Sequence, residues 1–277
     1  MRALIRWTKR VASRSVGTLT RHLPSGNLVG TIYRTPNGIF SISAADIYIA
    51  NVLRRNHAWA AEEVFSISAA TEAGSRVLFV GAHIGTLVIP VSRQAGEVVA
   101  IEANPDTYRF LMTNLMFNDV TNVTVHQVAA GEADGEIEFL LSRENSGGAK
   151  RRPVKSDPRY VYDHPSVVRV PMKRLDDLVE GSFSTIVMDI EGSEYFALKG
   201  MPRLLAGAER LFIEFLPHHI RNVAGVTSDE FCDLILPHLP SVTIGGRRFD
   251  GEAARLELRR MFEAEKDEDL ICFSRVA

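Results

Sequence analysis

The sequence predicts an α/β fold built on a parallel, doubly wound sheet with helices on both faces. From residue 76 onward, short apolar runs of strand length alternate with segments of helical periodicity, which is typical of that class. A glycine turn follows the first of these runs, and acidic residues end three others. Because ligands of such sheets bind beyond the carboxyl ends of the strands, the same pattern predicts where a site should lie.

We expect a basic, mainly helical extension over residues 1–71 and a ligand-binding domain over residues 72–277. The segment 1–45 carries seven basic residues and no acidic one. It has no continuous apolar core, so we do not expect a cleaved signal peptide. Two alternatives stay open for residues 1–21: a helix that packs on the domain or on a second subunit, and a basic helix that touches a membrane surface.

Within the extension, residues 26–45 are expected to form short strands and turns, because Thr-Pro-Asn-Gly at 35–38 is a turn sequence. Asp46 can cap a helix that follows it, and a second helix is expected from about residue 58 to residue 71.

The domain is expected to alternate strands and helices. Strands are expected at residues 76–80, 98–101, 123–127, 136–141, 167–170, 185–189 and 210–214. Helices are expected at residues 85–95, 105–116, 175–178, 195–205 and 228–238. The last two strands, at 241–244 and 269–274, enclose a charged helix at 251–265, and we expect them to form an antiparallel hairpin at one edge of the sheet.

One long segment interrupts this alternation. Residues 142–165 are polar, contain several glycines and prolines, and carry six basic residues against three acidic ones. Long irregular segments of a compact domain are usually functional lids or are disordered. We therefore expect a lid or substrate loop here.

Composition and charge are those of an ordinary globular chain. Of the 277 residues 45% are hydrophobic and 24% are charged, and the formal net charge of −2 gives no reason to expect a nucleic-acid partner. The two cysteines, Cys232 and Cys272, stand alone, and we expect them to be reduced core residues of a cytoplasmic protein. No run approaches the roughly 20 apolar residues of a membrane span.

The glycine turn between the first two domain strands predicts a nucleoside cofactor. The run 77–85 is typical of a buried strand followed by a turn that opens a helix. Gly81 and Gly85 let the backbone approach a ligand and let the helix pack closely on the sheet. Glu102 ends the second strand 21 residues after Gly81, where a carboxylate can bind both hydroxyls of a ribose.

Acids and histidines end two later strands. The run Asp-Ile-Glu-Gly-Ser-Glu (189–194) holds three carboxylates, and Glu214 is followed closely by His218 and His219. Because parallel strands end at one edge of a sheet, we expect the strand ends at Phe79–Gly81, Glu102, Asp189 and Glu214 to converge on one crevice. A metal site that includes Glu214 is an alternative, but spacing alone does not establish one, and we assign no metal.

Several common motifs are missing. Phe79 stands where the dinucleotide motif G-x-G-x-x-G requires a glycine, which argues against a dehydrogenase. The sequence also contains no P-loop and no G-x-S-x-G nucleophile elbow.

Taken together, these residues resemble the FkbM family of S-adenosylmethionine-dependent methyltransferases. The resemblance runs from about Arg76 to Leu216. Its motifs include Val-Gly-Ala-His-Ile-Gly (80–85), Ala-Ile-Glu-Ala-Asn-Pro-Asp (100–106) and Met-Asp-Ile-Glu-Gly-Ser-Glu (188–194), of which the last is the most specific.

The resemblance implies a class I methyltransferase fold, with a seven-stranded, mostly parallel sheet whose last strand is reversed. It also implies S-adenosylmethionine as cofactor and O-methylation of a hydroxyl on a sugar, polyketide or other secondary metabolite. A possible homo-oligomer is compatible with it. The cofactor site implied by position has Gly81, Ala82, His83 and Gly85 at the methionine part, Glu102 at the ribose with Asn104 beside it, and Val128 and Ala129 at the adenine. Asp189 completes this cofactor site on the side of the acceptor.

For the chemistry, the same comparison places Asp189 and Glu191 between cofactor and acceptor. We expect His218 or Asp189 to take the proton of the acceptor hydroxyl, with Glu191 and Glu214 orienting the acceptor. The positive charge of the 142–165 loop adds the hypothesis of an acceptor that bears phosphate, carboxylate or a carrier group.

This chain departs from the family pattern at three positions. Family members usually carry Asp at 79, Asn at 83 and often Lys at 187, whereas this chain has Phe79, His83 and Val187. An acid at 79 would be a partner of the cofactor's amino group, and its loss would weaken the binding of the cofactor by about 1.5–3 kcal/mol. This leaves two alternatives to methyl transfer: a catalytically lapsed binding or scaffold protein, and a cyclase or lyase that uses the same cofactor.

Overall fold

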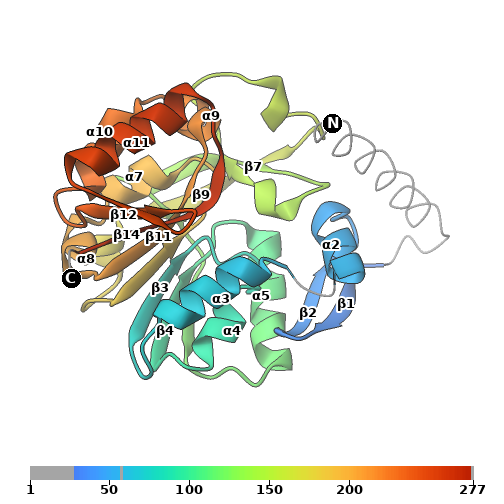
Figure 1. The fold of residues 1–277 in the computed structure, drawn as a ribbon. Helices are drawn as coiled ribbons and strands as arrows, with labels where there is room; N and C mark the ends of the chain where they lie inside the picture. The colour runs from blue at the N-terminus through green and yellow to red at the C-terminus, as the bar shows by residue number, and fades with distance from the viewer. Residues whose placement is uncertain (1–27, 57–58, 276–277) are drawn as a thin grey trace.

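The computed structural model describes residues 28–56 and 59–275; the predictions for residues 1–21 lie outside the described residues. The described chain is organised around an eight-stranded sheet (Figure 1). In spatial order its strands are β13 (Arg247–Asp250), β12 (Ser241–Ile244), β14 (Glu268–Ser274), β11 (Arg210–Phe215), β10 (Thr185–Met188), β3 (Arg76–Val80), β4 (Glu97–Ile101) and β5 (Val123–His126). The strands from β11 to β5 are parallel, and β14 is antiparallel to β11, as predicted for a reversed last strand.

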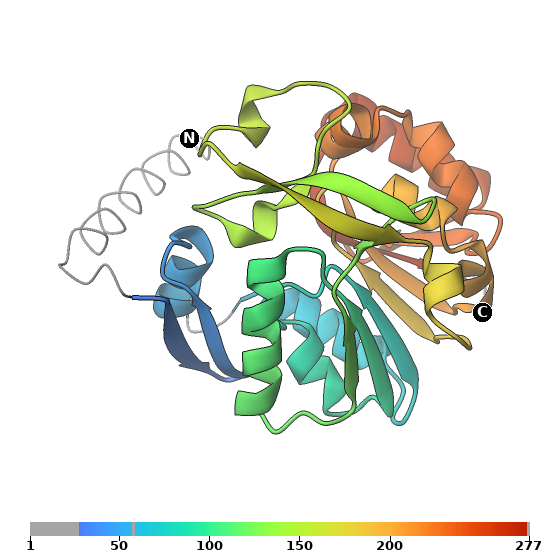
Figure 2. The same cartoon turned by 180° about the vertical axis from the view of Figure 1, so that it is seen from behind.

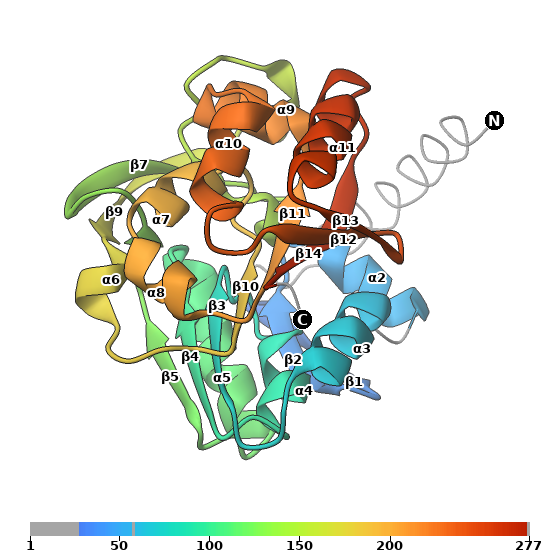
Figure 3. The same ribbon diagram turned by 60° about the vertical axis from the view of Figure 1, so that its left-hand side comes forward.

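Helices cover both faces of this sheet, which explains why its central strands are continuously apolar (Figure 3). One face is covered by α3 (Ala61–Ala70), α4 (Val88–Ser92) and α5 (Pro105–Phe117). The other face is covered by α7 (Glu194–Lys199), α8 (Pro202–Gly207), α10 (Ser228–Ile235) and α11 (Glu252–Glu263). Successive side chains of β3 therefore enter different cores: Leu78 and Val80 pack toward α7 and α8, whereas Val77 and Phe79 pack toward α3 and α4.

The N-terminal extension docks on α5 through two asparagine side chains. It contains the hairpin β1 (Gly30–Thr35) and β2 (Gly38–Ser43), then α2 (Tyr48–Asn56) and α3. Asn114 accepts from the backbone N–H of Ser41 at 2.6 Å and donates to its carbonyl at 3.0 Å, and Asn118 makes the same pair of bonds with Ile39. The two amides thus satisfy backbone groups that would otherwise be unpaired along β2.

The strands predicted at 136–141 and 167–170 do not continue the main sheet. They are β7 (Gly135–Leu141) and β9 (Ser166–Lys173), which pair antiparallel with each other in a second sheet. This sheet is completed by β6 (Ala129–Ala130), parallel to β9, and β8 (Lys150–Arg151), antiparallel to β7. Figure 2 shows these yellow-green strands crossing above α5 and the main sheet. The alternation of exposed and buried residues along β9 explains the separation, because an antiparallel sheet can leave one face in water.

The predicted C-terminal hairpin was only partly correct. Strands β12 and β14 are antiparallel neighbours, but β14 lies between β11 and β12, and the outer edge is formed by β13. The unpredicted hairpin of β12 and β13 turns through Gly245 and Gly246, both with positive φ. A Gly-Gly pair between two short strands is a common two-residue hairpin turn.

Two predicted helices were too long. The helix predicted at 85–95 is the short α4, because Gly85 has φ +90° and cannot be its first turn. The helix predicted at 195–205 is divided into α7 and α8 near Gly200, where Pro202 starts a new helix. The short helix predicted at 175–178 is present as α6 (Leu175–Leu178). In residues 28–56 and 59–275, no helix is long and apolar enough to span a membrane.

Candidate functional site

A cavity of about 530 Å³ lies beyond the carboxyl ends of the central strands. Gly81 follows β3, Glu102 follows β4, Asp189 follows β10 and Glu214 lies near the end of β11, and all four line this cavity. The convergence that the sequence pattern predicted is therefore present.

The glycine turn brings the ends of β3 and β10 into direct contact. Gly81 has φ +92°, and its N–H donates to the carbonyl of Ile101 at 2.9 Å. A Cβ at Gly81 would overlap the carbonyl oxygen of Asp189. Only glycine therefore allows this close approach, and the turn and Asp189 occupy one wall of the cavity.

Glu102 holds the glycine turn in place. Its Oε2 accepts from the backbone N–H of His83 at 2.7 Å, and its Oε1 accepts from that of Asn104 at 2.8 Å. Burial raises the pKa of Glu102 to about 7, although these two bonds oppose the shift. A carboxylate has about four acceptor positions, so two are left for a ligand in the cavity.

His83 connects the turn to the 142–165 loop and to the N-terminal extension. Its Nε2 lies 2.8 Å from the hydroxyl of Ser146, and that hydroxyl donates to Asp46 at 2.6 Å. Because the single hydroxyl proton goes to Asp46, Nε2 of His83 carries the proton of the neutral ring. Burial lowers the pKa of His83 to about 4, so the ring is neutral at physiological pH.

The carboxylates that follow β10 and end β11 repel one another. Asp189 is solvent-accessible and lines the cavity, although protein atoms surround it closely. Burial and the charge of Glu191 raise its pKa well above the ordinary value, and burial and Asp189 do the same for Glu214. Glu214 interrupts the register between β11 and β14, and such a bulge re-aims a side chain beside a site.

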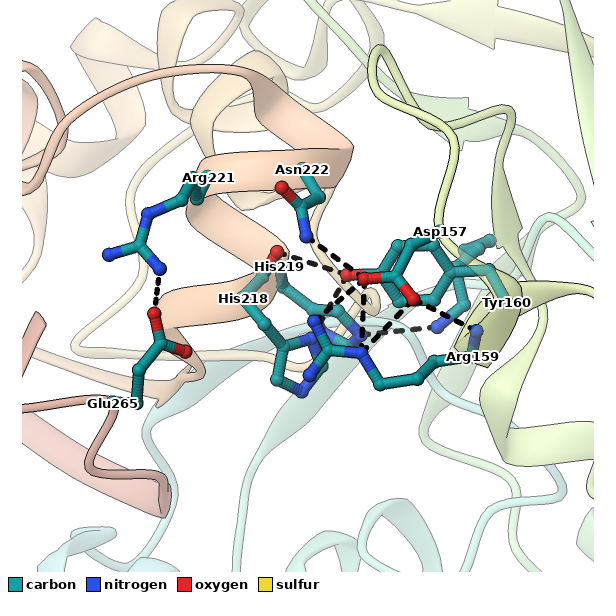
Figure 4. Close-up of polar contacts among 9 residues, drawn as sticks. Asp157, Arg159, Tyr160, His218, His219, Arg221, Asn222 and Glu265 are labelled. Atoms are coloured by element: carbon teal, nitrogen blue, oxygen red, sulfur yellow. Dashed lines mark hydrogen bonds and ion pairs between the residues drawn. The ribbon is translucent and has the colours of Figure 1, made fainter.

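The two histidines after β11 have different surroundings. In the short helix α9 (Pro217–His219), His219 is buried, with Nε2 3.5 Å from Glu191 and Nδ1 3.5 Å from Glu214. His218 turns instead to Tyr160, whose hydroxyl lies 3.0 Å from its Nδ1 (Figure 4). His218 is not among the residues that line the cavity, and its role as proton acceptor remains a prediction that its position does not favour.

A family model described as Methyltransferase FkbM domain matches residues 80–233. The match covers more than half of the chain. The chain belongs to the FkbM methyltransferase family. The strand order of the main sheet, with its reversed β14, is that of a class I methyltransferase, and β13 is an addition at the edge.

Solved structures similar to this FkbM chain include other methyltransferases. Methyltransferase FkbM from Methylobacillus flagellatus KT is 19% identical over 73% of this chain and 44% of that chain, with a TM-score of 0.46. Trm5b from Pyrococcus abyssi is 14% identical over 79% and 50%, with a TM-score of 0.45. TYW2 from M. jannaschii, in complex with AdoMet, is 18% identical over 69% and 64%, with a TM-score of 0.38. This chain thus spans less than two thirds of each, and no curated protein matches it.

Most residues of the predicted cofactor site line the cavity of this FkbM domain. They are Gly81, Ala82, His83, Glu102, Val128, Ala129 and Asp189. The other two do not line it. Asn104 caps α5 by accepting from the backbone N–H of Asp106, and Gly85 packs against Leu111 of that helix.

Lys150 is the site residue that the sequence analysis missed. It is buried, and its ammonium group donates to Glu191 at 2.8 Å and lies 3.2 Å from Nε2 of His219. Because an ammonium group only donates, Nε2 accepts and the ring proton is on Nδ1, facing Glu214. Burial and Lys150 lower the pKa of His219, which keeps the ring neutral. The basic excess of the 142–165 loop was its only sequence signal.

The charge of the cavity wall contradicts the anionic-acceptor hypothesis. Six carboxylates line it and, among the residues that the structure describes, no lysine or arginine does; they are Glu63, Glu102, Asp189, Glu191, Glu214 and Asp269. Two arginines of the 142–165 loop have other partners: Arg151 lies over the ring of Phe196, and Arg159 pairs with Asp157 (Figure 4). The loop therefore supplies no basic side chain to the cavity wall.

Proposed function

We propose that this chain catalyses S-adenosylmethionine-dependent methylation of a hydroxyl group on a small molecule, such as a sugar, a polyketide or another secondary metabolite. The observation that carries the proposal is one cavity that joins the glycine turn and Glu102 to Asp189. Transfer reactions are accelerated when both reactants are held side by side, and a shared cavity supports that arrangement.

The cavity wall suits S-adenosylmethionine. Gly81 presents bare backbone, Glu102 keeps two acceptor positions for a ribose, and Val128 and Ala129 offer apolar surface for an adenine. The excess of carboxylates suits a ligand of net positive charge. We propose that these residues hold the cofactor, which when bound supplies an electrophilic methyl group on a positively charged sulfur.

Asp189 is the proton acceptor that we propose. It is accessible to the cavity, and its raised pKa makes it a stronger base than an ordinary carboxylate. In the proposed step the proton of the acceptor hydroxyl moves to the carboxylate of Asp189, and the oxygen becomes the nucleophile. Glu191 and Glu214, which line the same cavity, are proposed to orient the acceptor.

The histidines are less suited to this role. His219 has no free lone pair while Lys150 donates to its Nε2 and its Nδ1 carries the proton. We propose instead that Lys150 and His219 position Glu191 and Glu214, which they bridge.

The first test is cofactor binding, measured by calorimetry with S-adenosylhomocysteine and S-adenosylmethionine. We expect Glu102→Ala to weaken binding by about tenfold or more, because it removes a charged acceptor of hydrogen bonds. Glu97→Ala, at the far end of the same strand, should bind as the wild type does. If neither nucleoside binds at millimolar concentration, the proposal fails and the scaffold alternative stands.

The second test follows the product of turnover. Asp189→Asn should lower the rate by about 10² or more while it binds S-adenosylhomocysteine as the wild type does. Asp177→Asn, which is exposed on α6, is the control. S-adenosylhomocysteine is the product of methyl transfer, whereas methylthioadenosine would indicate the cyclase or lyase alternative.

A further inference from the structure

The N-terminal extension and β14 form part of the cavity wall. Tyr48 of α2 and Trp59 line it, with ring centroids 6.0 Å apart in an edge-to-face arrangement. Glu63 of α3 and Asp269 of β14 line the same cavity. None of these residues belongs to the glycine turn or to the strand ends where we place the cofactor.

Neither Glu63 nor Asp269 is neutralised by a residue that the structure describes. Among the described residues, Glu63 and Asp269 form no ion pair, although many other surface acids do. Asp269 is close enough to Asp189 that its charge contributes to the raised pKa of that residue, after burial and the nearer carboxylates. The two acids therefore add uncompensated negative charge to a cavity without a lysine or arginine on its described wall.

A second observation indicates that the cavity lacks a polar partner. Ser193 lines it, is only 7% exposed, and has a hydroxyl oxygen without a hydrogen-bond partner among the described residues. Buried hydroxyls are normally paired, because an unpaired one costs about 1–3 kcal/mol. A ligand with polar groups would supply that partner.

The charge balance exceeds what the cofactor can neutralise. S-adenosylmethionine carries a sulfonium, an ammonium and a carboxylate, and hence one net positive charge. Even with Asp189 and Glu214 protonated, as their raised pKa values favour, the four other carboxylates of the cavity wall outnumber the positive charges of the cofactor and of the buried Lys150 beside them. Aromatic faces and carboxylates together are the usual surroundings of a bound organic cation.

We infer that the methyl acceptor carries a protonated amine, which binds at the end of the cavity formed by Tyr48, Trp59, Glu63 and Asp269. The acceptor would thus be an amino alcohol or amino sugar, with the hydroxyl directed to Asp189 and the ammonium group at this end. The inference rests on the proposed function of the same cavity, and it narrows the class of acceptor.

The test uses three probes of one shape and different charge: cyclohexylammonium, cyclohexanol and cyclohexanecarboxylate. Their dissociation constants are measured by ligand-observed NMR with the full chain saturated with S-adenosylhomocysteine. We expect the ammonium to bind about tenfold more tightly than the alcohol, and the carboxylate to bind most weakly. Equal binding of the ammonium and the alcohol, tighter binding of the carboxylate, or no binding of the ammonium overturns the inference.

Matched variants locate the effect. Glu63→Gln and Asp269→Asn should each reduce ammonium binding several-fold and leave cyclohexanol unchanged. The controls are Glu62→Gln and Asp267→Asn, which make the same charge changes at exposed positions that do not line the cavity. Both controls should bind the ammonium probe as the wild type does. If all four variants bind the ammonium equally, the probe binds elsewhere and the inference fails.

Failure of the inference is distinguishable from failure of the proposed function. Binding of S-adenosylhomocysteine is measured separately by calorimetry, and it tests the proposed function alone. If it does not bind, the three probes are titrated into the unliganded chain, where the same ranking and the same variants decide whether the cavity selects a cation.

Discussion

Phe79 and Val187 lie directly opposite each other in the neighbouring parallel strands β3 and β10. Both are buried, at 1% and 2% exposure, and both pack in the core beneath α3 and α4. These are two of the positions where the chain departs from the FkbM pattern, which has Asp and often Lys there. Because the two side chains share a face, one apolar pair occupies the place of a potential ion pair. Phe79 does not line the cavity, so we assign it a packing role.

Because Phe79 and Val187 are paired, we expect the effect of a substitution at one position on stability to depend on the residue at the other. Phe79→Asp should lower the free energy of unfolding by about 3–5 kcal/mol, because it buries a charge without a partner. The double variant Phe79→Asp/Val187→Lys should recover part of that loss. Urea denaturation of the wild type, both single variants and the double variant measures the coupling. Strictly additive losses would show that the two side chains do not interact.

The glycine turn predicts a second difference in stability. Gly81→Ala combines a positive φ with a clash against the carbonyl of Asp189. Gly74→Ala is the matched control, because Gly74 has φ +77° and no atom within 4 Å of an added Cβ. We expect the control to lower the free energy of unfolding by about 1–2 kcal/mol, and Gly81→Ala to lower it by at least about 2 kcal/mol more. Urea denaturation measures both losses. Equal losses would mean that the backbone of Asp189 yields to the new methyl group.

Local patterns explain which parts of the fold could be predicted from the sequence. The apolar runs of β3, β4 and β10 and the Asn104-Pro105 start of α5 are recognisable without knowledge of their partners. The second sheet is different, because β7 pairs with β9 across the 142–165 loop, and the two strands look the same whichever sheet they join. Pairing between distant segments is decided by packing that a local pattern does not encode.

The same distinction applies to the site. The carboxylates at strand ends were predictable because the topology fixes where parallel strands finish. Lys150 was not, since its function comes from burial against Glu191, 41 residues away in the chain. His218 and His219 are equivalent in the sequence, and the short helix α9 alone determines which of them contacts the acids.

The burial of Glu194 leads us to expect that the free energy of unfolding depends on pH. It is 4% exposed, and burial raises its pKa from 4.5 to about 7. The folded protein therefore holds this proton more tightly than the unfolded chain does. The resulting stability is complete below about pH 4.5 and is lost as pH rises through about 7, a change of about 3 kcal/mol. Urea denaturation from pH 4.5 to 8 measures the difference in the free energy of unfolding between the wild type and Glu194→Gln. This difference should decrease by about 3 kcal/mol over that range.

Glu72→Gln is the control for this pH dependence, because Glu72 is exposed. Its difference from the wild type should stay constant across the same range. A constant difference for Glu194→Gln as well would show that Glu194 ionises as easily in the folded protein as in the unfolded chain.

We expect the positive charge of Lys150 to control the ionisation of the carboxylates around it. Burial and neighbouring acids raise the pKa values of Asp189 and Glu214, and the positive charge of Lys150 opposes both shifts. Lys150→Met should therefore move both pKa values further upward. Carbon-13 NMR of the side-chain carboxyl groups measures this directly, without a need for the acceptor. Because a protonated Asp189 cannot act as a base, the acidic limb of the pH–rate profile should shift to higher pH in the same variant.

The control for Lys150 is Lys155→Met, which removes the same charge from an exposed position of the 142–165 loop. It should leave the carboxyl titrations and the pH–rate profile unchanged, because the interactions of an exposed charge are weakened by the high dielectric constant of water and screened by salt, with a Debye length of about 10 Å at 0.1 M. If Lys150→Met lowered the rate at every pH without moving the acidic limb, Lys150 would act by positioning Glu191 alone. A shift of the limb in both variants would instead indicate that the loop acts through its total charge, and not through the one ammonium group buried against Glu191.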